Sequence, residues 1–279
     1  MSASEPPPGA PETAAGLPPV PDDAGDTRGR HLRRLLGHPA TLIITLVVAI
    51  AAFVAVAAAG HPLFGLAAAG VVALFALLIV FLLARSAAAE DFFNAYARGR
   101  GLRRTSGKSG LPPLSPLLQR GERRYSEQRF DGVLPGGLDG SLAHYTYEEE
   151  TRDSDGNRQT SYFHFTVAIS QIPGAATLTR ELFCQRRVGF RFLDAAEDVF
   201  RRRQRVEHES DAVDRKFEIF IGADDDPNRA RQVLSPSFLV WLADHCPEEF
   251  AFEVVAGALV TNLKGHKKTA AELDELCQA

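Results

Sequence analysis

No Asp, Glu, Lys or Arg occurs between Pro39 and Ala84, a stretch long enough to cross a lipid bilayer twice. Residues 40–60 would form a helix of about 31 Å at about 1.5 Å per residue, which matches the hydrocarbon thickness of a membrane. Residues 62–84 form a slightly longer apolar run, and Gly60-His61-Pro62 favours a tight turn between the two. Uncharged runs of this length are rare in soluble proteins, where the alternative would be a buried helix pair. We therefore predict a transmembrane helical hairpin.

The connection inside this hairpin lacks basic residues, whereas both flanks have them. The flanking residues are Arg28, Arg30, Arg33 and Arg34 before it, and Arg85, Arg98, Arg100, Arg103, Arg104 and Lys108 after it. Since basic residues near a span stay on the cytoplasmic side, both chain ends are expected in the cytoplasm. A cleaved signal peptide is not expected, because an acidic, proline-rich segment and a full-length span come first. The bias toward arginine and alanine suggests a bacterial origin, and hence a multi-pass protein of the plasma membrane.

Cysteine is also scarce, with Cys184, Cys246 and Cys277 scattered along the chain. An odd number without Cys-x-x-Cys spacing is typical of reduced thiols and argues against a disulfide framework or a cysteine-based zinc site. The formal net charge of -4 argues against a general nucleic-acid binder. We predict no cofactor and no nucleic-acid partner.

The run GRGLRRTSGKSG, residues 99–110, lacks what a phosphate-binding loop requires. In the pattern G-x-x-x-x-G-K-[ST], Gly107-Lys108-Ser109 would need a glycine at the position that Leu102 holds. The preceding residues have a helical pattern, with Phe92, Phe93 and Tyr96 at helical spacing, so no strand is expected before the run. A basic, glycine-rich linker is the simpler interpretation.

These features divide the chain into four parts. Residues 1–38 are predicted to be a disordered, Pro- and Ala-rich cytosolic tail, because they contain few large apolar groups. Residues 39–85 are the hairpin, residues 86–120 a juxtamembrane helix and basic linker, and residues 121–279 a cytosolic domain large enough for a core of its own.

The pattern of the last part changes to period two and predicts an α+β domain with a mostly antiparallel sheet and packed helices. Strands are expected over 122–134, 140–150 and 158–172, with Asp155-Gly156 as the hairpin turn, and shorter ones over 188–193, 202–209 and 214–222. A helix is expected to open at Asp226-Pro227 or Ser235-Pro236, followed by a strand pair within 249–263 and a closing helix over 266–279.

The segment from about residue 207 onward resembles a bacterial family of membrane-attached cytosolic domains of unknown function. The positions that carry the resemblance are Glu209, Ser210, Phe217, Phe220, Asp226, Ala230, Leu234, Ser235 and Pro236. Two membrane spans before the domain fit the same family, and the resemblance covers roughly residues 86–265. Residues 211–214 depart from the family's pattern, which leaves the turn there open. The resemblance implies a membrane-anchored domain and no known activity.

Histidines are the first candidates for metal binding or acid–base chemistry. A two-residue turn at Asp155-Gly156 places His164 opposite Tyr147 and His144 opposite Val167, so the two histidines would point to opposite faces. A change of register by one residue would reverse that result. We therefore assign no metal-binding, cofactor-binding or catalytic residue.

Other polar clusters have simpler explanations. Asp224-Asp225-Asp226 before Pro227 has the spacing of a helix cap. The Asp153–Asn157 segment has its glycine too early for a calcium loop, and is a turn. His245 and Cys246 are adjacent at a helix end, where their side chains point in different directions.

The basic residues Arg98, Arg100, Arg103, Arg104 and Lys108 are the candidate membrane-surface contacts. Just beyond a cytoplasmic span end, each can gain about 1 kcal/mol from anionic lipid head groups; the alternative is that they only set topology. The function expected is a membrane-tethered interaction or ligand-sensing module with a protein partner or a second copy, and non-enzymatic. The alternative is a membrane-anchored hydrolase. A concave site that gathers His144 or His164 with Glu148 or Glu150 would favour the hydrolase.

Overall fold

The structure is a computed structural model that describes residues 62–152, 156–177, 179–187, 203–207 and 210–278, together with Val47, Ile50 and Val54. The chain divides into two compact units, Met1–Arg100 and Gly101–Ala279. The predicted tail, most of the predicted first span and the strand expected over 188–193 lie outside the described residues.

The described part of the first unit is mainly one long helix, α3 (Pro62–Gly99). It contains the predicted second span and continues through Phe92 and Tyr96, whose rings stack at 6.4 Å, so the helical pattern there is confirmed. Large apolar side chains in its first two thirds expose half or more of their surface: Val71, Leu74, Phe75, Leu78, Ile79, Leu82 and Leu83. Among the residues described, no helix meets both the length and the hydropathy needed to cross a membrane.

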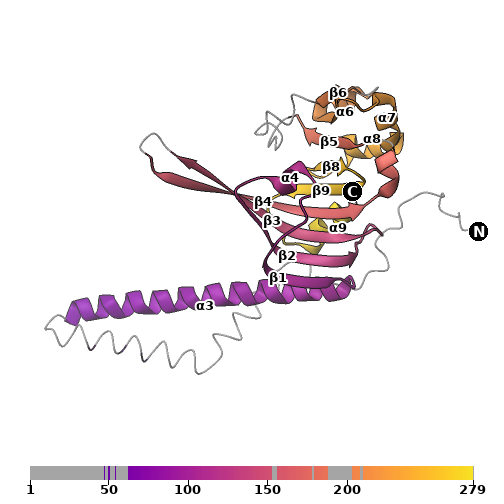
Figure 1. The fold of residues 1–279 in the computed structure, drawn as a ribbon. Helices are drawn as coiled ribbons and strands as arrows, with labels where there is room; N and C mark the ends of the chain where they lie inside the picture. The colour runs from indigo at the N-terminus through magenta and orange to yellow at the C-terminus, as the bar shows by residue number, and fades with distance from the viewer. Residues whose placement is uncertain are drawn as a thin grey trace, which may run out of the picture. The chain divides into compact units, whose positions relative to one another are not determined.

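The second unit is built on one antiparallel sheet with the strand order β1-β2-β3-β4-β9-β8-β5-β7-β6 (Figure 1). The strands are β1 (Arg103–Ser109), β2 (Arg123–Val133), β3 (Asp139–Arg152), β4 (Arg158–Gln171), β5 (Glu181–Arg186), β6 (Arg203–Val206), β7 (Phe217–Gly222), β8 (Ala251–Val255) and β9 (Ala258–Lys264). This confirms the α+β class and the mostly antiparallel sheet.

Short helices connect these strands. They are α4 (Pro116–Gln119), the 3-10 helix η1 (Pro173–Thr177), α6 (Asp211–Lys216), α7 (Pro227–Val233), α8 (Pro236–Asp244) and α9 (Ala270–Gln278). Both proposed helix starts are used, because Asp226 caps α7 and Ser235 caps α8, each followed by proline. The uncertain turn at 211–214 is a helix, α6, capped by Ser210.

The segment expected to be a basic linker differs from that prediction in part. Residues 103–109 form β1, an edge strand that pairs with β2, and the second unit begins at Gly101, before the boundary expected at residue 121. The sequence showed no alternation there because one side of β1 has no neighbouring strand and most of its residues are exposed. Lys108 and Ser109 lie within this strand, which also rules out a phosphate-binding loop at the start of a helix.

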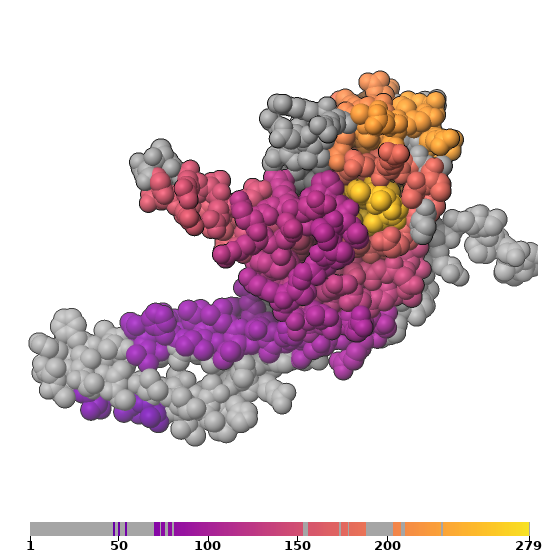
Figure 2. Space-filling view, in the orientation of Figure 1, coloured from indigo at the N-terminus to yellow at the C-terminus, as the bar shows by residue number. Residues whose placement is uncertain are grey.

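Two long strands extend beyond the rest of the sheet. β2 follows β3 only as far as the pair Arg123–Glu148, and β9 meets β4 only from Phe165 onward. Beyond these points β3 and β4 pair only with each other among the described strands. Figures 1 and 2 show this two-stranded arm standing out from the domain.

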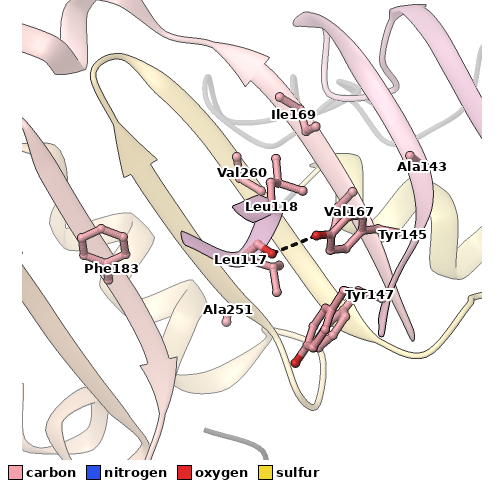
Figure 3. Packing of buried hydrophobic residues seen from close by; sticks show 11 residues of the cluster. Leu117, Leu118, Ala143, Tyr145, Tyr147, Val167, Ile169, Phe183, Ala251 and Val260 are labelled. Atoms are coloured by element: carbon pink, nitrogen blue, oxygen red, sulfur yellow. Dashed lines mark hydrogen bonds between the residues drawn. The ribbon is translucent and has the colours of Figure 1, made fainter. Parts of the chain in front are cut away.

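The core lies on the face of the sheet that carries Tyr145, Tyr147 and Val167 (Figure 3). The helical turn α4 places Leu117 and Leu118, both buried, against these side chains. Tyr145 donates a hydrogen bond from its hydroxyl to the Leu117 carbonyl at 3.1 Å, the dashed line in Figure 3. Helix α9 packs on β4 and β9, and Figure 1 draws it behind the sheet while α4 lies in front.

A buried carboxyl group also binds the backbone of α4. Glu253 on β8 is fully buried and accepts from the Leu117 amide at 3.3 Å and 3.4 Å, one distance to each oxygen. Burial raises the pKa of Glu253 to about 7, although hydrogen bonds from Ser115 and the Leu117 amide act in the opposite direction. The sheet thus holds α4 by apolar packing and by two polar contacts.

Candidate metal centre

The register of β3 and β4 brings the two histidines to one face of the sheet. His144 pairs with Thr166, and Thr146 pairs with His164, so all four side chains share a face. The prediction that His144 and His164 point to opposite faces was therefore wrong. Five residues connect the paired Arg152 and Arg158, an odd number, whereas a two-residue turn requires an even number. This difference shifts the register of β4 against β3 by one residue and places the two histidines on the same face.

A bulge in β2 adds a carboxylate to this face. Ser126 pairs with Tyr145 and Gln128 with His144, which leaves Glu127 between them as the extra residue. The bulge breaks the alternation of β2. The Glu127 side chain reaches Thr146, whose hydroxyl donates to its Oε1 at 3.3 Å.

The connection between β9 and α9 brings His266 to the same place. Gly265 has φ of +82° and donates its amide to the His164 carbonyl at 2.7 Å. Two residues later, the Lys267 amide donates to the Thr166 hydroxyl at 2.8 Å. Hydrogen bonds from the amides of Gly265 and Lys267 therefore fix the path of the backbone on both sides of His266.

The His144 ring stacks on one face of the His266 ring. The two imidazoles are parallel within 6° at a centroid distance of 4.6 Å, and His144 donates from Nε2 to the Lys267 carbonyl at 2.8 Å. His144 is buried, and desolvation together with the nearby His266 lowers its pKa to about 3. It is therefore a neutral packing and hydrogen-bonding residue at neutral pH.

Three of these side chains bring their ligand atoms close enough together to hold a metal ion. Ligand atoms of Glu127, His164 and His266 all lie within 4.8 Å of one another. His266 Nδ1 is 3.7 Å from Glu127 Oε2. Two ligands about 2.0 Å from a tetrahedral ion lie about 3.3 Å apart, so this pair is close to the required separation. The three residues come from different elements, namely β2, β4 and the β9–α9 connection.

The protonation of His266 also suits a metal ligand. Its Nε2 is 3.2 Å from the Tyr145 carbonyl, which can only accept, so the proton of the neutral ring is on Nε2. The lone pair is then on Nδ1, which faces the Glu127 carboxylate. Burial lowers the pKa of His266, despite the Tyr145 carbonyl and Glu127, and this favours the neutral ring that binds metals.

The cluster lies at the surface. His164 is exposed, the Glu127 side chain exposes 43% of its surface and the His266 side chain 14%. Two imidazoles and one carboxylate are a donor set suited to Zn²⁺ or Fe²⁺, and three protein ligands leave positions for water or another ligand.

The carboxylates considered with the histidines are placed differently. Glu148 and Glu150 share the face of Thr146, but they lie further along β3, opposite Tyr162 and Thr160. Glu150 faces Arg158 at 3.8 Å on the arm. Neither glutamate belongs to the cluster of ligand atoms. The concave site of a histidine with Glu148 or Glu150, which would have favoured a hydrolase, is therefore not formed by these residues.

The basic candidates for membrane contact are split between the two units. Arg98 and Arg100 belong to the first, and Arg103, Arg104 and Lys108 to β1 in the second. Arg104 donates to Gln128 at 2.8 Å and 2.6 Å, and the Lys108 ammonium lies 3.8 Å from the centre of the Tyr125 ring. The Arg103 side chain is 82% exposed.

The remaining candidates have structural roles. Asp225 accepts from Thr179 and from the amides of Arg180 and Glu181, and Asp226 caps α7. His245 lies at the end of α8, as its sequence context suggested. The Asp153–Asn157 segment is mostly outside the described residues.

Glu127 and His266 were not predicted as site residues from the sequence. No short-range pattern connects them with His164, because the cluster forms only when three separate parts of the chain meet. The only local signal was the break in alternation after Ser126, which marks a bulge.

Neither the known protein families, nor curated sequences, nor solved structures include a significant match to this chain. The resemblance to a family of membrane-attached domains stays a prediction.

Proposed function

We propose that this protein is a membrane-tethered, ligand-sensing module whose ligand is a divalent transition-metal ion bound by Glu127, His164 and His266. The observation that carries the proposal is the convergence of the three ligand atoms within 4.8 Å of one another. An imidazole oriented by a backbone carbonyl, as His266 is by Tyr145, is the usual arrangement behind metal-binding histidines.

The membrane part of the proposal is a two-span hairpin over about 40–60 and 62–84, with both termini in the cytoplasm of a bacterium. Its support is the charge-free sequence from Pro39 to Ala84 and the large apolar side chains that α3 exposes. Apolar surface of that extent is typical of a membrane or protein interface. The basic residues that follow α3 would add contacts with anionic head groups.

Metal binding is tested on the full-length protein in detergent micelles. Co²⁺ absorption and competition with Zn²⁺ should show one site per chain. His164→Ala, His266→Ala and Glu127→Gln should each weaken binding by about 100-fold or more, because even outer-shell changes cost about 10–100-fold. His245→Ala removes an exposed histidine outside the cluster and should bind as the wild type does. Equal affinity in all four variants would overturn the proposal.

Topology is tested separately in cells. Alkaline phosphatase fused after His61 should be active, since it would lie outside, and the same enzyme fused at the C-terminus should be inactive. A green fluorescent protein at the C-terminus should fluoresce. The opposite pattern, or release of the protein from membranes by alkaline carbonate, would contradict the hairpin.

A metal-dependent hydrolase is the second candidate, favoured by the exposure of His164. With three protein ligands, a zinc ion bound here would keep a water molecule whose pKa would be about 7. Zinc-loaded protein should then hydrolyse a phosphodiester or carboxylic ester, and His164→Ala should remove that activity. Metal binding without turnover of either substrate would favour the sensing function.

A further inference from the structure

Thr146 lies at the centre of the cluster without being a candidate ligand. It is fully buried on β3, and its hydroxyl oxygen is 2.9 Å from His164 Nδ1 and 3.3 Å from His266 Nε2. The same oxygen is 3.3 Å from Glu127 Oε1. One hydroxyl group therefore contacts all three of the proposed ligands.

The number of protons on Thr146 and on the two imidazole rings determines which group donates and which accepts in each of these contacts. A threonine hydroxyl has one proton to donate and two lone pairs to accept. The Glu127 carboxylate can only accept, so the hydroxyl proton points to it. His266 Nε2 carries a proton already, because it faces the Tyr145 carbonyl as well.

The remaining lone pair of the Thr146 oxygen accepts from His164 Nδ1. The proton of the neutral His164 ring is then on Nδ1, and its lone pair is on Nε2. With this assignment the three contacts of Thr146 use one donor and two acceptors, which is the full capacity of a hydroxyl.

We propose that Thr146 is the positioning residue of this metal site and fixes the tautomer of both histidines. His164 would present Nε2 to the metal, His266 would present Nδ1, and Glu127 would bind through Oε2 because Oε1 accepts from Thr146. This inference rests on the proposed metal-binding function. It adds which atoms bind and what orients them.

The tautomers are measured first, without metal, by ¹⁵N NMR of the full-length protein labelled at histidine. His164 should carry its proton on Nδ1 and His266 on Nε2, with His164→Ala and His266→Ala used to assign the signals. In Thr146→Val, which keeps the shape and removes the hydroxyl, the His164 proton should move to Nε2. A wild-type His164 with its proton on Nε2 overturns the inference.

Metal affinity is measured next. Thr146→Val should weaken Co²⁺ and Zn²⁺ binding by about 10–100-fold, in the range of outer-shell substitutions, and Thr146→Ser should restore it. Thr151→Val, on the exposed arm of the same strand, is the matched control and should bind normally. If Thr146→Val binds as tightly as the wild type, the inference fails and the metal site stands. If the wild type binds no metal, the proposed function fails, whereas the tautomer experiment still decides the assignment.

Discussion

The two faces of β3 and β4 differ in how they are completed. One face carries Tyr145, Tyr147 and Phe165, and α4 closes it with Leu117 and Leu118. The other face carries His144, Thr146 and His164, and its neighbours are the Glu127 bulge and the connection that contains His266. Over residues 144–147 and 164–165, alternate residues of the same two strands thus serve polar contacts and packing. Neighbours in sequence are therefore expected to differ sharply in the effect of substitution.

The largest expected effect comes from two adjacent residues that face opposite ways. Phe165→Ala removes a buried ring and should lower the free energy of unfolding by about 3–5 kcal/mol. His164→Ala removes an exposed ring and should cost about 1 kcal/mol or less. Thermal unfolding can be followed by the fluorescence of Trp241, the single tryptophan. Equal losses in the two variants would contradict the assignment of faces.

The core face should also show a pH dependence from Glu253. Its pKa is raised from 4.5 to about 7, so the folded state binds the proton more tightly than the unfolded state. The contribution of protonated Glu253 to the free energy of unfolding is fully present below about pH 4.5 and is lost as the pH rises through about 7. The total change is about 3 kcal/mol.

The measurement is denaturant unfolding at pH 5 and at pH 8. Glu253→Gln should match the wild type near pH 5 and exceed its stability at pH 8. Glu248→Gln, which alters an exposed carboxylate, should leave the pH dependence unchanged. A wild type whose pH profile overlaps that of Glu253→Gln would contradict the expected pKa.

On the polar face, stability should respond to metal. An ion present at about 100 times its dissociation constant stabilises a protein that binds it only when folded by about 2.7 kcal/mol. Zn²⁺ should therefore raise the melting temperature of the wild type and of Phe165→Ala alike, but not that of His164→Ala. A rise in His164→Ala would place the ion elsewhere.

The smallest expected effect is on the contact between the sheet and α4. Tyr145→Phe removes the hydroxyl that donates to the Leu117 carbonyl and should cost about 1 kcal/mol. Tyr162→Phe, on the exposed arm, is the control and should change stability little. If Tyr145→Phe leaves the unfolding free energy unchanged, this hydrogen bond does not help to hold α4.

Much of the fold could be predicted from the sequence, because strong period-two patterns mark β2, β3 and β4, and proline after a capping residue marks α7 and α8. β1 could not, since an edge strand with exposed side chains has no alternation. Prediction of the site depended on the length of the connection between β3 and β4. A two-residue turn at Asp155-Gly156 would put His144 and His164 on opposite faces, whereas the five-residue connection puts them on the same face. Glu127 and His266 required long-range pairing, which no local pattern contains.

The β2 bulge has a consequence for how such a site can arise or disappear. Deleting the single codon for Glu127 would let β2 pair with β3 without interruption, and the sheet would keep its strand order. The site would lose its carboxylate in the same step. One insertion or deletion, rather than a series of substitutions, could therefore separate a metal-binding form of this domain from a form that retains only the fold.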